Sequence, residues 1–240
     1  MLTATSFVAG SDFLSGQKKN PRVAKAYKEK HDLLSSRLKE MNLSLDNIQI
    51  LLVAYKNEKQ LELYVKQKQE TRYRKLTTYA ICRTSGEPGP KRSQGDLQIP
   101  EGFYFLDKFN PCSDYYLSLG ISYPNASDRI LCKSGNPGGD IYIHGECVTI
   151  GCMPITNDKI QELYIYAIQA KENGQNNIPV YIFPFRFTDS NLSKFREQYK
   201  ADKTLLEFWN DLKTGYDKFT RNLSELKVRV DPANGKYRVQ

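Results

Sequence analysis

The stretch Asp140-Ile-Tyr-Ile-His-Gly-Glu-Cys-Val-Thr-Ile-Gly-Cys152 holds one of the chain's two histidines and two of its five cysteines. Apolar isoleucines before the histidine indicate a short buried strand ending at His144-Gly145, and a tight loop then ends at Cys152. The reactive form of cysteine is the thiolate, so a nucleophile needs a base within hydrogen-bond reach. Gly151 lets backbone N–H groups approach an oxyanion without an intervening side chain. The stretch therefore predicts a cysteine acyl-transfer site.

The same residue types allow a second interpretation, a zinc site. Cys132, His144, Cys147 and Cys152 are all possible zinc ligands, although the chain has no C-x-x-C pair. His144 and Cys147 are three residues apart beside a strand, and an odd offset points side chains to opposite faces. We therefore expect neither a metal nor a cofactor. An odd cysteine count leaves at least one thiol unpaired in a monomer, and Cys152 is the candidate.

Length and composition indicate one domain with additions: 240 residues with 40% hydrophobic content can bury one good core. The net charge is +8, but Lys and Arg are scattered and do not form the run with interleaved aromatics that is typical of nucleic-acid binding. We expect a solvated basic surface and no nucleic-acid partner. An anionic cell envelope is an equally natural partner for such a charge.

No segment approaches the roughly 18 consecutive apolar residues that a membrane-spanning helix needs. Residues 1–17 are uncharged apart from Asp12 and lack the basic start of a signal peptide. Either an export signal has been removed or the protein is cytosolic, and composition alone leaves both open.

Hydrophobic periodicity places the remaining elements. Asn20-Pro21 is a typical helix start, and apolar residues at helical spacing continue the helix to about Met41, with His31 a surface or packing residue. Thr156 or Asn157 can cap a second helix that Gly174 ends, and a third follows the stripe from Leu205 to Phe219. We expect strands at 48–56, 61–66, 73–83, 102–109, 115–123, 140–145 and 178–185, with a final hairpin within 228–240. The long Gly- and Pro-rich loop 84–100 is expected to be functional or mobile.

His144-Gly145 followed by Thr149-Ile150-Gly151-Cys152 resembles the motif of the L,D-transpeptidase catalytic (YkuD-type) domain, and most closely that of its YafK-like branch. The chain shares with that branch a short spacer between His144 and Cys152, which contains an extra cysteine, Cys147. Further matching blocks, which together are highly specific, are Ser85-Gly-Glu-Pro-Gly-Pro-Lys91, Gly95-Asp96, Pro100-Glu-Gly-Phe-Tyr104, Tyr123-Pro-Asn-Ala-Ser-Asp-Arg129 and Phe183-Pro-Phe-Arg186.

The resemblance implies an α+β fold: a mostly β catalytic sandwich or barrel with an N-terminal helix and C-terminal helical additions. We expect an N-terminal segment over 1–44, the catalytic domain over 45–186 and a helical extension over 187–240. The resemblance also implies an exported protein of the periplasm or cell envelope that acts on peptidoglycan stem peptides, with an envelope lipoprotein as a further partner. We expect the protein to be a monomer. Cys152 would form a thioester with the third stem residue, and His144 would be the base, oriented by a backbone carbonyl. An amine or water would then take the acyl group.

Two positions depart from the family's pattern. The wider family has His before Gly-Cys and Arg two residues after the cysteine, where this chain has Ile150 and Pro154. Another cation must then hold the substrate carboxylate, and Lys91, Arg129 and Arg186 are candidates, with ordinary ion pairs as the alternative for each. Thr149 and Gly145 are further substrate-binding candidates from the motif.

A second functional class, a non-catalytic envelope-binding module that keeps the fold, stays open. Such a module would not need both His144 and Cys152. The third stem residue, the acyl acceptor and the disulfide pairing of Cys82, Cys112, Cys132 and Cys147 are left open by the sequence.

Overall fold

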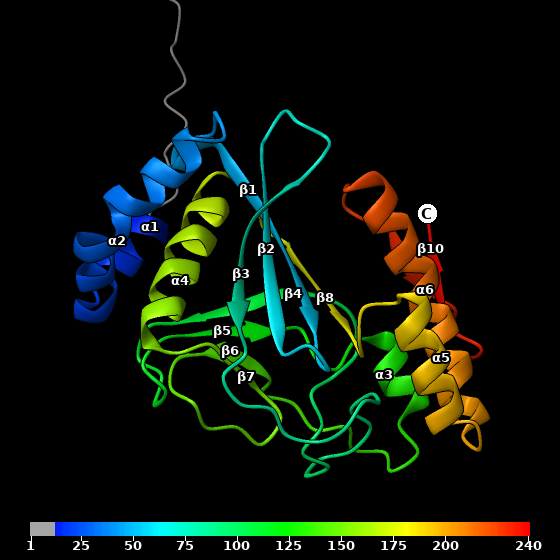
Figure 1. Cartoon of the computed structure of the whole chain (residues 1–240). Coiled ribbons are helices and arrows are strands. Elements are labelled where there is room, and N and C mark those ends of the chain that lie inside the picture. The colour runs from blue at the N-terminus through cyan, green and yellow to red at the C-terminus, as the bar shows by residue number, and fades with distance from the viewer. Residues whose placement is uncertain (1–12) are drawn as a thin grey trace, which may run out of the picture.

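The computed structural model describes residues 13–240. Its centre is an eight-stranded mixed sheet with helices on two sides (Figure 1). The helices are α1 (Phe13–Lys18), α2 (Pro21–Lys39), the 3₁₀ helix η1 (Leu45–Asn47), α3 (Ala126–Leu131), α4 (Asn157–Glu172), α5 (Asp189–Gln198) and α6 (Lys203–Asn222). The strands are β1 (Ile48–Tyr55), β2 (Gln60–Gln67), β3 (Arg74–Ala80), β4 (Gly102–Asn110), β5 (Ser118–Ile121), β6 (Tyr142–His144), β7 (Met153–Pro154), β8 (Ile178–Phe183) and, in a separate hairpin, β9 (Val228–Val230) and β10 (Tyr237–Val239).

The strand order of the large sheet is β3-β2-β1-β8-β4-β5-β6-β7. The late strand β8 lies in the middle, parallel to β1 and antiparallel to β4. Strands β6 and β7 pair in parallel at one edge. The chain that follows β3 at the other edge returns to this edge, because the Cys82 N–H donates to the Pro154 carbonyl at 2.9 Å. The sheet therefore curls as a half-barrel, and the stretch with His144 and Cys152 lies where its edges meet.

Both faces of the central strands are buried, which explains why residues 50–55 form a continuous apolar run. Ile50 and Leu52 belong to the core cluster that includes residues of α2 and α4. Leu51 and Val53, which alternate with them, belong to a second cluster with residues of α5 and α6. Figure 1 shows the same division, with α1, α2 and α4 on one side and α3, α5 and α6 on the other. The predicted α+β class, with an N-terminal helix and C-terminal helices, is confirmed.

The longest predicted elements are confirmed. The Asn20 side chain accepts a hydrogen bond from the Arg22 N–H at 2.9 Å at the start of α2, which ends at Lys39, two residues before the predicted end. The strands at 48–56, 61–66 and 73–83 form the antiparallel meander β1–β2–β3. The terminal hairpin β9–β10 turns at Asn234-Gly235, where Gly235 has φ of +74°.

Two predicted strands are shorter than expected. The strand at 115–123 is limited to β5, because Tyr116 has φ of +76° and cannot continue an extended chain. The strand at 140–145 begins at Tyr142, after Asp140 with φ of +55°. Helix α4 begins after Thr156, but the Thr156 side chain makes no capping hydrogen bond. The Asn157 side chain instead accepts the Glu146 N–H at 2.9 Å, so the start of α4 holds the loop that follows His144.

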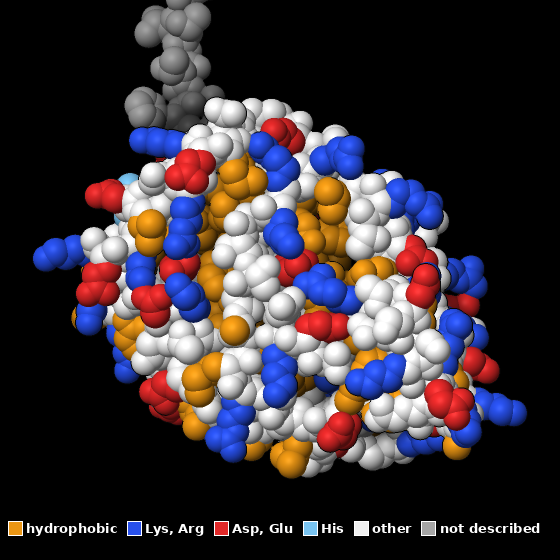
Figure 2. Space-filling view, viewed as in Figure 1, with side chains coloured by type: hydrophobic (Ala, Val, Ile, Leu, Met, Phe, Trp, Pro, Cys, Tyr) orange, Lys and Arg blue, Asp and Glu red, His pale blue; other side chains and the backbone are white. Residues whose placement is uncertain are grey.

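Helices α1, α3 and α5 and strand β7 were not predicted. Helix α3 has only six residues and depends on a capping box between Asn125 and Asp128. Within residues 13–240, no helix is both long and apolar enough to cross a membrane. The expectation about a signal at the start of the chain falls largely on residues 1–12, outside the described residues. On the face in Figure 2, basic and acidic side chains are interspersed.

Candidate active site

The pairing of β6 with β7 brings His144 and Cys152 to one cavity. Ile143 and His144 lie beside Met153 and Pro154, so Cys152 immediately precedes the paired residues. The Cys152 Sγ lies 3.7 Å from the Asp140 carbonyl oxygen. Both side chains line a cavity of about 600 Å³. The structure thus brings together the nucleophile and the base that the sequence predicts.

The His144 ring is held by its own chain neighbour. Its Nδ1 lies 2.5 Å from the Gly145 carbonyl oxygen. A carbonyl oxygen can only accept, so Nδ1 carries the proton and Nε2 is left as the basic nitrogen. The Tyr115 ring packs on the imidazole with 4.7 Å between centroids. A backbone carbonyl therefore does what an aspartate does in a Ser-His-Asp triad: it fixes the tautomer.

Burial sets the charge state of both groups. It lowers the pKa of His144 below its ordinary value of 6.5, although the Gly145 carbonyl and Glu146 act in the opposite direction. It also raises the pKa of the Cys152 thiol above 9.0, against a smaller lowering by the Tyr142 N–H and by Lys91. The free protein therefore holds a neutral thiol and a neutral imidazole near pH 7.

The loop before Cys152 is stabilised internally by Thr149. The Thr149 hydroxyl donates to the Cys152 carbonyl at 2.8 Å and accepts the Gly151 N–H at 3.1 Å. Gly151 has φ of +139°, and a Cβ there would lie 3.2 Å from the Gln98 carbonyl oxygen. The Gly151 N–H is thus directed at Thr149. Gly151 allows the turn that presents Cys152, and Thr149 lines the cavity and holds that turn.

Gly145 is required by packing. A Cβ at this position would collide with Asn157 Oδ1 and lie 2.9 Å from the Tyr115 carbonyl oxygen. The close approach lets the N-terminal end of α4 sit against the strand that carries His144. Gly145 is not among the residues that line the cavity, and its role in substrate binding stays a prediction.

A disulfide bond connects Cys82 with Cys147, 65 residues apart. It joins the segment after β3 to the loop between His144 and Cys152, and resolves part of the pairing that the sequence left open. Among the described cysteines, Cys112, Cys132 and Cys152 are free thiols. The zinc alternative loses Cys147 as a thiolate ligand. In residues 13–240 no group of three His, Cys, Asp or Glu side chains is arranged to hold a metal ion.

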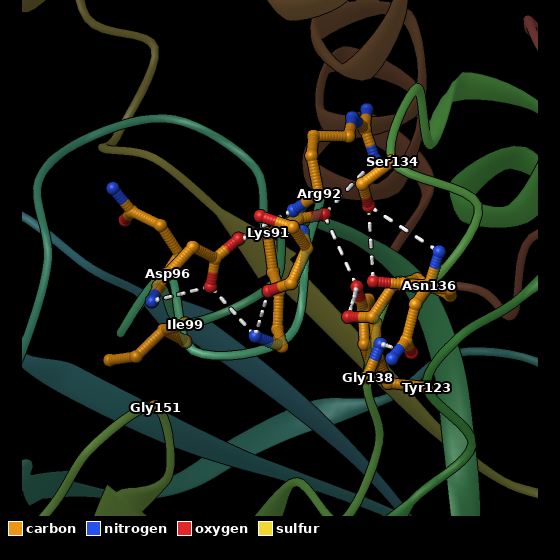
Figure 3. Close-up of polar contacts among 12 residues, drawn as sticks. Lys91, Arg92, Asp96, Ile99, Tyr123, Ser134, Asn136, Gly138 and Gly151 are labelled. Carbon is orange, nitrogen blue, oxygen red and sulfur yellow. Dashed lines mark hydrogen bonds and ion pairs between the residues drawn. The ribbon is translucent and has the colours of Figure 1, made fainter.

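The three predicted substrate cations lie elsewhere than the cavity lining. Lys91 is buried, and its ammonium contacts Asp96 at 2.7 Å and the Ser93 carbonyl at 2.8 Å (Figure 3). Arg186 donates to Glu62 at 2.9 Å and stacks over a tyrosine ring. Arg129 is exposed on α3. The substrate-binding role of all three stays a prediction. The cation that does line the cavity is Arg83, which sequence reasoning missed.

The loop 84–100 is fixed at its base by a buried ion pair. The Lys56 ammonium donates to the carbonyls of Gly89 at 2.6 Å and Ile99 at 2.8 Å, and to Glu101 at 3.0 Å. Glu101 also accepts from the Trp209 indole of α6 at 2.9 Å. Both charged side chains are at least 95% buried. The two ends of the loop are therefore attached to the sheet and to the C-terminal helices.

A larger cavity, of about 710 Å³, lies between this loop and α6. Gly89, Arg92, Leu131 and Phe208 are among its lining residues, and the Arg92 guanidinium lies 4.7 Å from the Phe208 ring centroid. Neither His144 nor Cys152 lines it. Volume alone therefore does not identify the reactive site, and the chemistry favours the smaller cavity.

Comparison with known proteins agrees with this geometry. The family model described as the L,D-transpeptidase catalytic domain, YkuD, matches residues 49–182, which span β1 to β8 and include His144 and Cys152. The chain belongs to the L,D-transpeptidase catalytic-domain family. YafK of Escherichia coli strain K12, provisionally named an L,D-transpeptidase, is 39% identical over 201 residues, which cover 83% of this chain and 77% of YafK.

Solved structures are more distant. The helical cell shape determining protein Pgp2 of Campylobacter jejuni is 20% identical, with a TM-score of 0.46 over 77% of this chain and 74% of Pgp2. Bd1075 of Bdellovibrio bacteriovorus is 21% identical, with a TM-score of 0.39 over 71% of this chain and 62% of Bd1075.

Proposed function

We propose that this L,D-transpeptidase-family protein cleaves peptidoglycan stem peptides after their third residue, with Cys152 as the nucleophile and His144 as the base. One observation carries the proposal: both side chains line the same cavity, and the Gly145 carbonyl leaves His144 Nε2 unprotonated. The substrate class follows from membership of the family. The disulfide between Cys82 and Cys147 fits an exported protein of the periplasm or cell envelope.

The reaction has two steps. As the Cys152 sulfur bonds to the carbonyl carbon at the L-centre of the third residue, His144 Nε2 accepts the thiol proton. The bond from that carbon to the departing amine then breaks, and the imidazolium gives its proton to the amine. In the second step His144 takes a proton from the acceptor, whose oxygen or nitrogen attacks the thioester. The carbon–sulfur bond breaks, and the sulfur regains its proton.

We further propose that water is the main acceptor. The support is the short spacer between His144 and Cys152 that the chain shares with the YafK-like branch. An amine acceptor needs a second groove that holds it and keeps water away from the thioester. Hydrolysis of a tetrapeptide would leave a tripeptide, and hydrolysis at an attached lipoprotein peptide would release that peptide.

Mass spectrometry of the products tests both proposals. Purified protein would be given peptidoglycan fragments that bear a tetrapeptide or an attached lipoprotein peptide. We expect tripeptides, and a predominance of new 3–3 crosslinked dimers would restore the transpeptidase alternative. Cys152→Ala should abolish both products, while the matched variant Cys132→Ala, which removes a free thiol outside the cavity, should retain turnover. Turnover by Cys152→Ala would refute the nucleophile. A non-catalytic binding module would give no product with any of the three proteins.

A further inference from the structure

Arg83 is the single Lys or Arg among the described residues that line the Cys152 cavity. Its side chain is exposed, and no described residue forms a hydrogen bond or ion pair with it. Two acids, Asp114 and Asp140, line the same cavity. Asp140 is already 3.4 Å from Lys108. The cavity thus contains a guanidinium whose charge is not used within the described chain.

The backbone fixes where this guanidinium begins. The preceding residue, Cys82, donates its N–H to the Pro154 carbonyl at 2.9 Å. Cys82 is also bonded to Cys147. The Arg83 side chain therefore begins beside Pro154, and Pro154 is the second residue after Cys152. This is the position where the family pattern has its arginine and this chain has proline. The segment after β3 therefore supplies, in Arg83, a cation that the motif itself lacks.

The other candidate cations are already used or lie elsewhere. The Lys91 ammonium is neutralised by Asp96, and the Arg186 guanidinium by Glu62. Neither residue lines the cavity, and Arg129 does not line it either. A guanidinium matches a carboxylate with two parallel hydrogen bonds, and this match is strongest where no internal acid competes.

We propose that Arg83 forms the carboxylate-binding subsite of this active site, which rests on the function proposed above. The ligand is a carboxylate of the stem peptide. It has two possible sources: the side-chain end of a third residue that is a diamino acid, or the terminal carboxylate of the departing fourth residue. The acids in the same cavity suit the first source, because the far end of such a diamino acid carries an ammonium beside its carboxylate. Arg83 orients the substrate and takes no part in proton transfer.

Kinetics with matched variants and substrates tests the subsite. Arg83→Gln should lower kcat/KM by about 10- to 100-fold, mainly through KM, since a hydrogen bond to a charged group contributes about 1.5–3 kcal/mol. Arg83→Lys should lose less, because it keeps the charge but not the paired geometry. The control is Arg72→Gln. Arg72 is an exposed arginine without a described partner, and it precedes β3 as Arg83 follows it, so a strand about 20 Å long lies between the two residues. It should behave as wild type.

Amidated substrates identify the carboxylate. One fragment carries an amide at the side-chain end of the third residue, and another carries a C-terminal amide. The amide at the recognised position should lower wild-type kcat/KM as much as Arg83→Gln does, and should have no further effect on Arg83→Gln. The subsite would be overturned if Arg83→Gln lowered kcat/KM, relative to wild type, by the same factor for the amidated as for the unmodified fragments. It would also be overturned if the substitution did not lower kcat/KM for any fragment.

Binding separates failure of the subsite from failure of the proposed function. In the Cys152→Ala background, calorimetric titration with the unmodified tetrapeptide fragment needs no turnover. Adding Arg83→Gln should weaken binding by the same factor, about 10- to 100-fold. Undiminished binding would reject Arg83 even if the catalytic proposal held. If Arg83→Gln weakened binding in this background but the protein with Cys152 intact turned over no fragment, the subsite would be supported and the proposed reaction rejected.

Discussion

The Nδ1 atom of His144 lies 2.5 Å from the carbonyl oxygen of Gly145, the next residue in the chain. Gly145 cannot carry a side chain, because a Cβ would collide with Asn157 at the start of α4. The same backbone unit therefore packs the helix against the strand and fixes the tautomer of the base. The imidazole is buried without a carboxylate partner on Nδ1, which explains why its pKa is lowered.

This environment predicts the pH dependence of the reaction. Because burial lowers the pKa of His144, the imidazole stays basic to lower pH, and the acid limb of kcat/KM should lie below pH 6.5. Because burial raises the pKa of Cys152, alkylation of this thiol by iodoacetamide should still increase with pH above 9.0. Mass spectrometry of the Cys152 peptide measures the alkylation. A plateau in its rate near pH 7 would instead indicate a thiolate–imidazolium pair.

Substitution of the base separates the two histidines. His144→Ala should lower kcat by roughly 10²- to 10⁴-fold, the usual contribution of a positioned general acid–base group. His31→Ala should leave the rate unchanged, because His31 lies on α2, where it contacts Asp32 and the Tyr27 ring. Steady-state rates with one stem-peptide fragment measure both effects. Equal rates for wild type and His144→Ala would remove His144 from the mechanism.

The disulfide should contribute to stability more than to chemistry. Cys147→Ala removes a crosslink that closes a loop of 65 residues, and should lower the free energy of unfolding by about 2–5 kcal/mol. Cys152 and His144 remain, so turnover should persist at a reduced level. Urea unfolding and the product assay measure the two quantities. Reducing agent should lower wild-type stability similarly, and should leave Cys147→Ala unaffected.

Local sequence patterns predicted the elements that local forces determine. The Asn20 cap and the apolar periodicity after it suffice for α2, and the apolar run of β1 reports burial on two faces. The pairing of His144 and Cys152 was also predicted, since a strand and a short loop place them close together. Helix α5, with ten residues and one buried side chain, gave too weak a periodicity.

The parts that were missed depend on contacts between distant segments. Arg83 reaches the cavity because Cys82 pairs with Pro154 and Cys147, and nothing in residues 82–83 indicates either partner. Lys56 directly follows β1, and a lysine at the end of a strand usually lies on the protein surface. Only the assembled fold shows that Glu101 and two loop carbonyls surround it.

The buried pair of Lys56 and Glu101 gives the last prediction. Glu101→Gln leaves the Lys56 ammonium without its counter-charge in a site where burial already lowers its pKa. We expect the free energy of unfolding to fall by about 3–5 kcal/mol, the usual cost of breaking a buried ion pair. The control is Glu197→Gln, which removes the partner of Lys200 in a pair whose side chains are 72–74% exposed. It should change stability by less than about 0.5 kcal/mol.

Activity measurements show whether the Lys56–Glu101 pair also positions the loop 84–100 or only stabilises the fold. Glu101 also accepts the Gly89 N–H at 2.7 Å, so the substitution loosens the loop whose start follows Arg83. At a temperature where Glu101→Gln remains folded by circular dichroism, KM should rise, while the rate of Cys152 alkylation should not change. Wild-type KM in the folded variant would show that the pair stabilises the fold without positioning the loop.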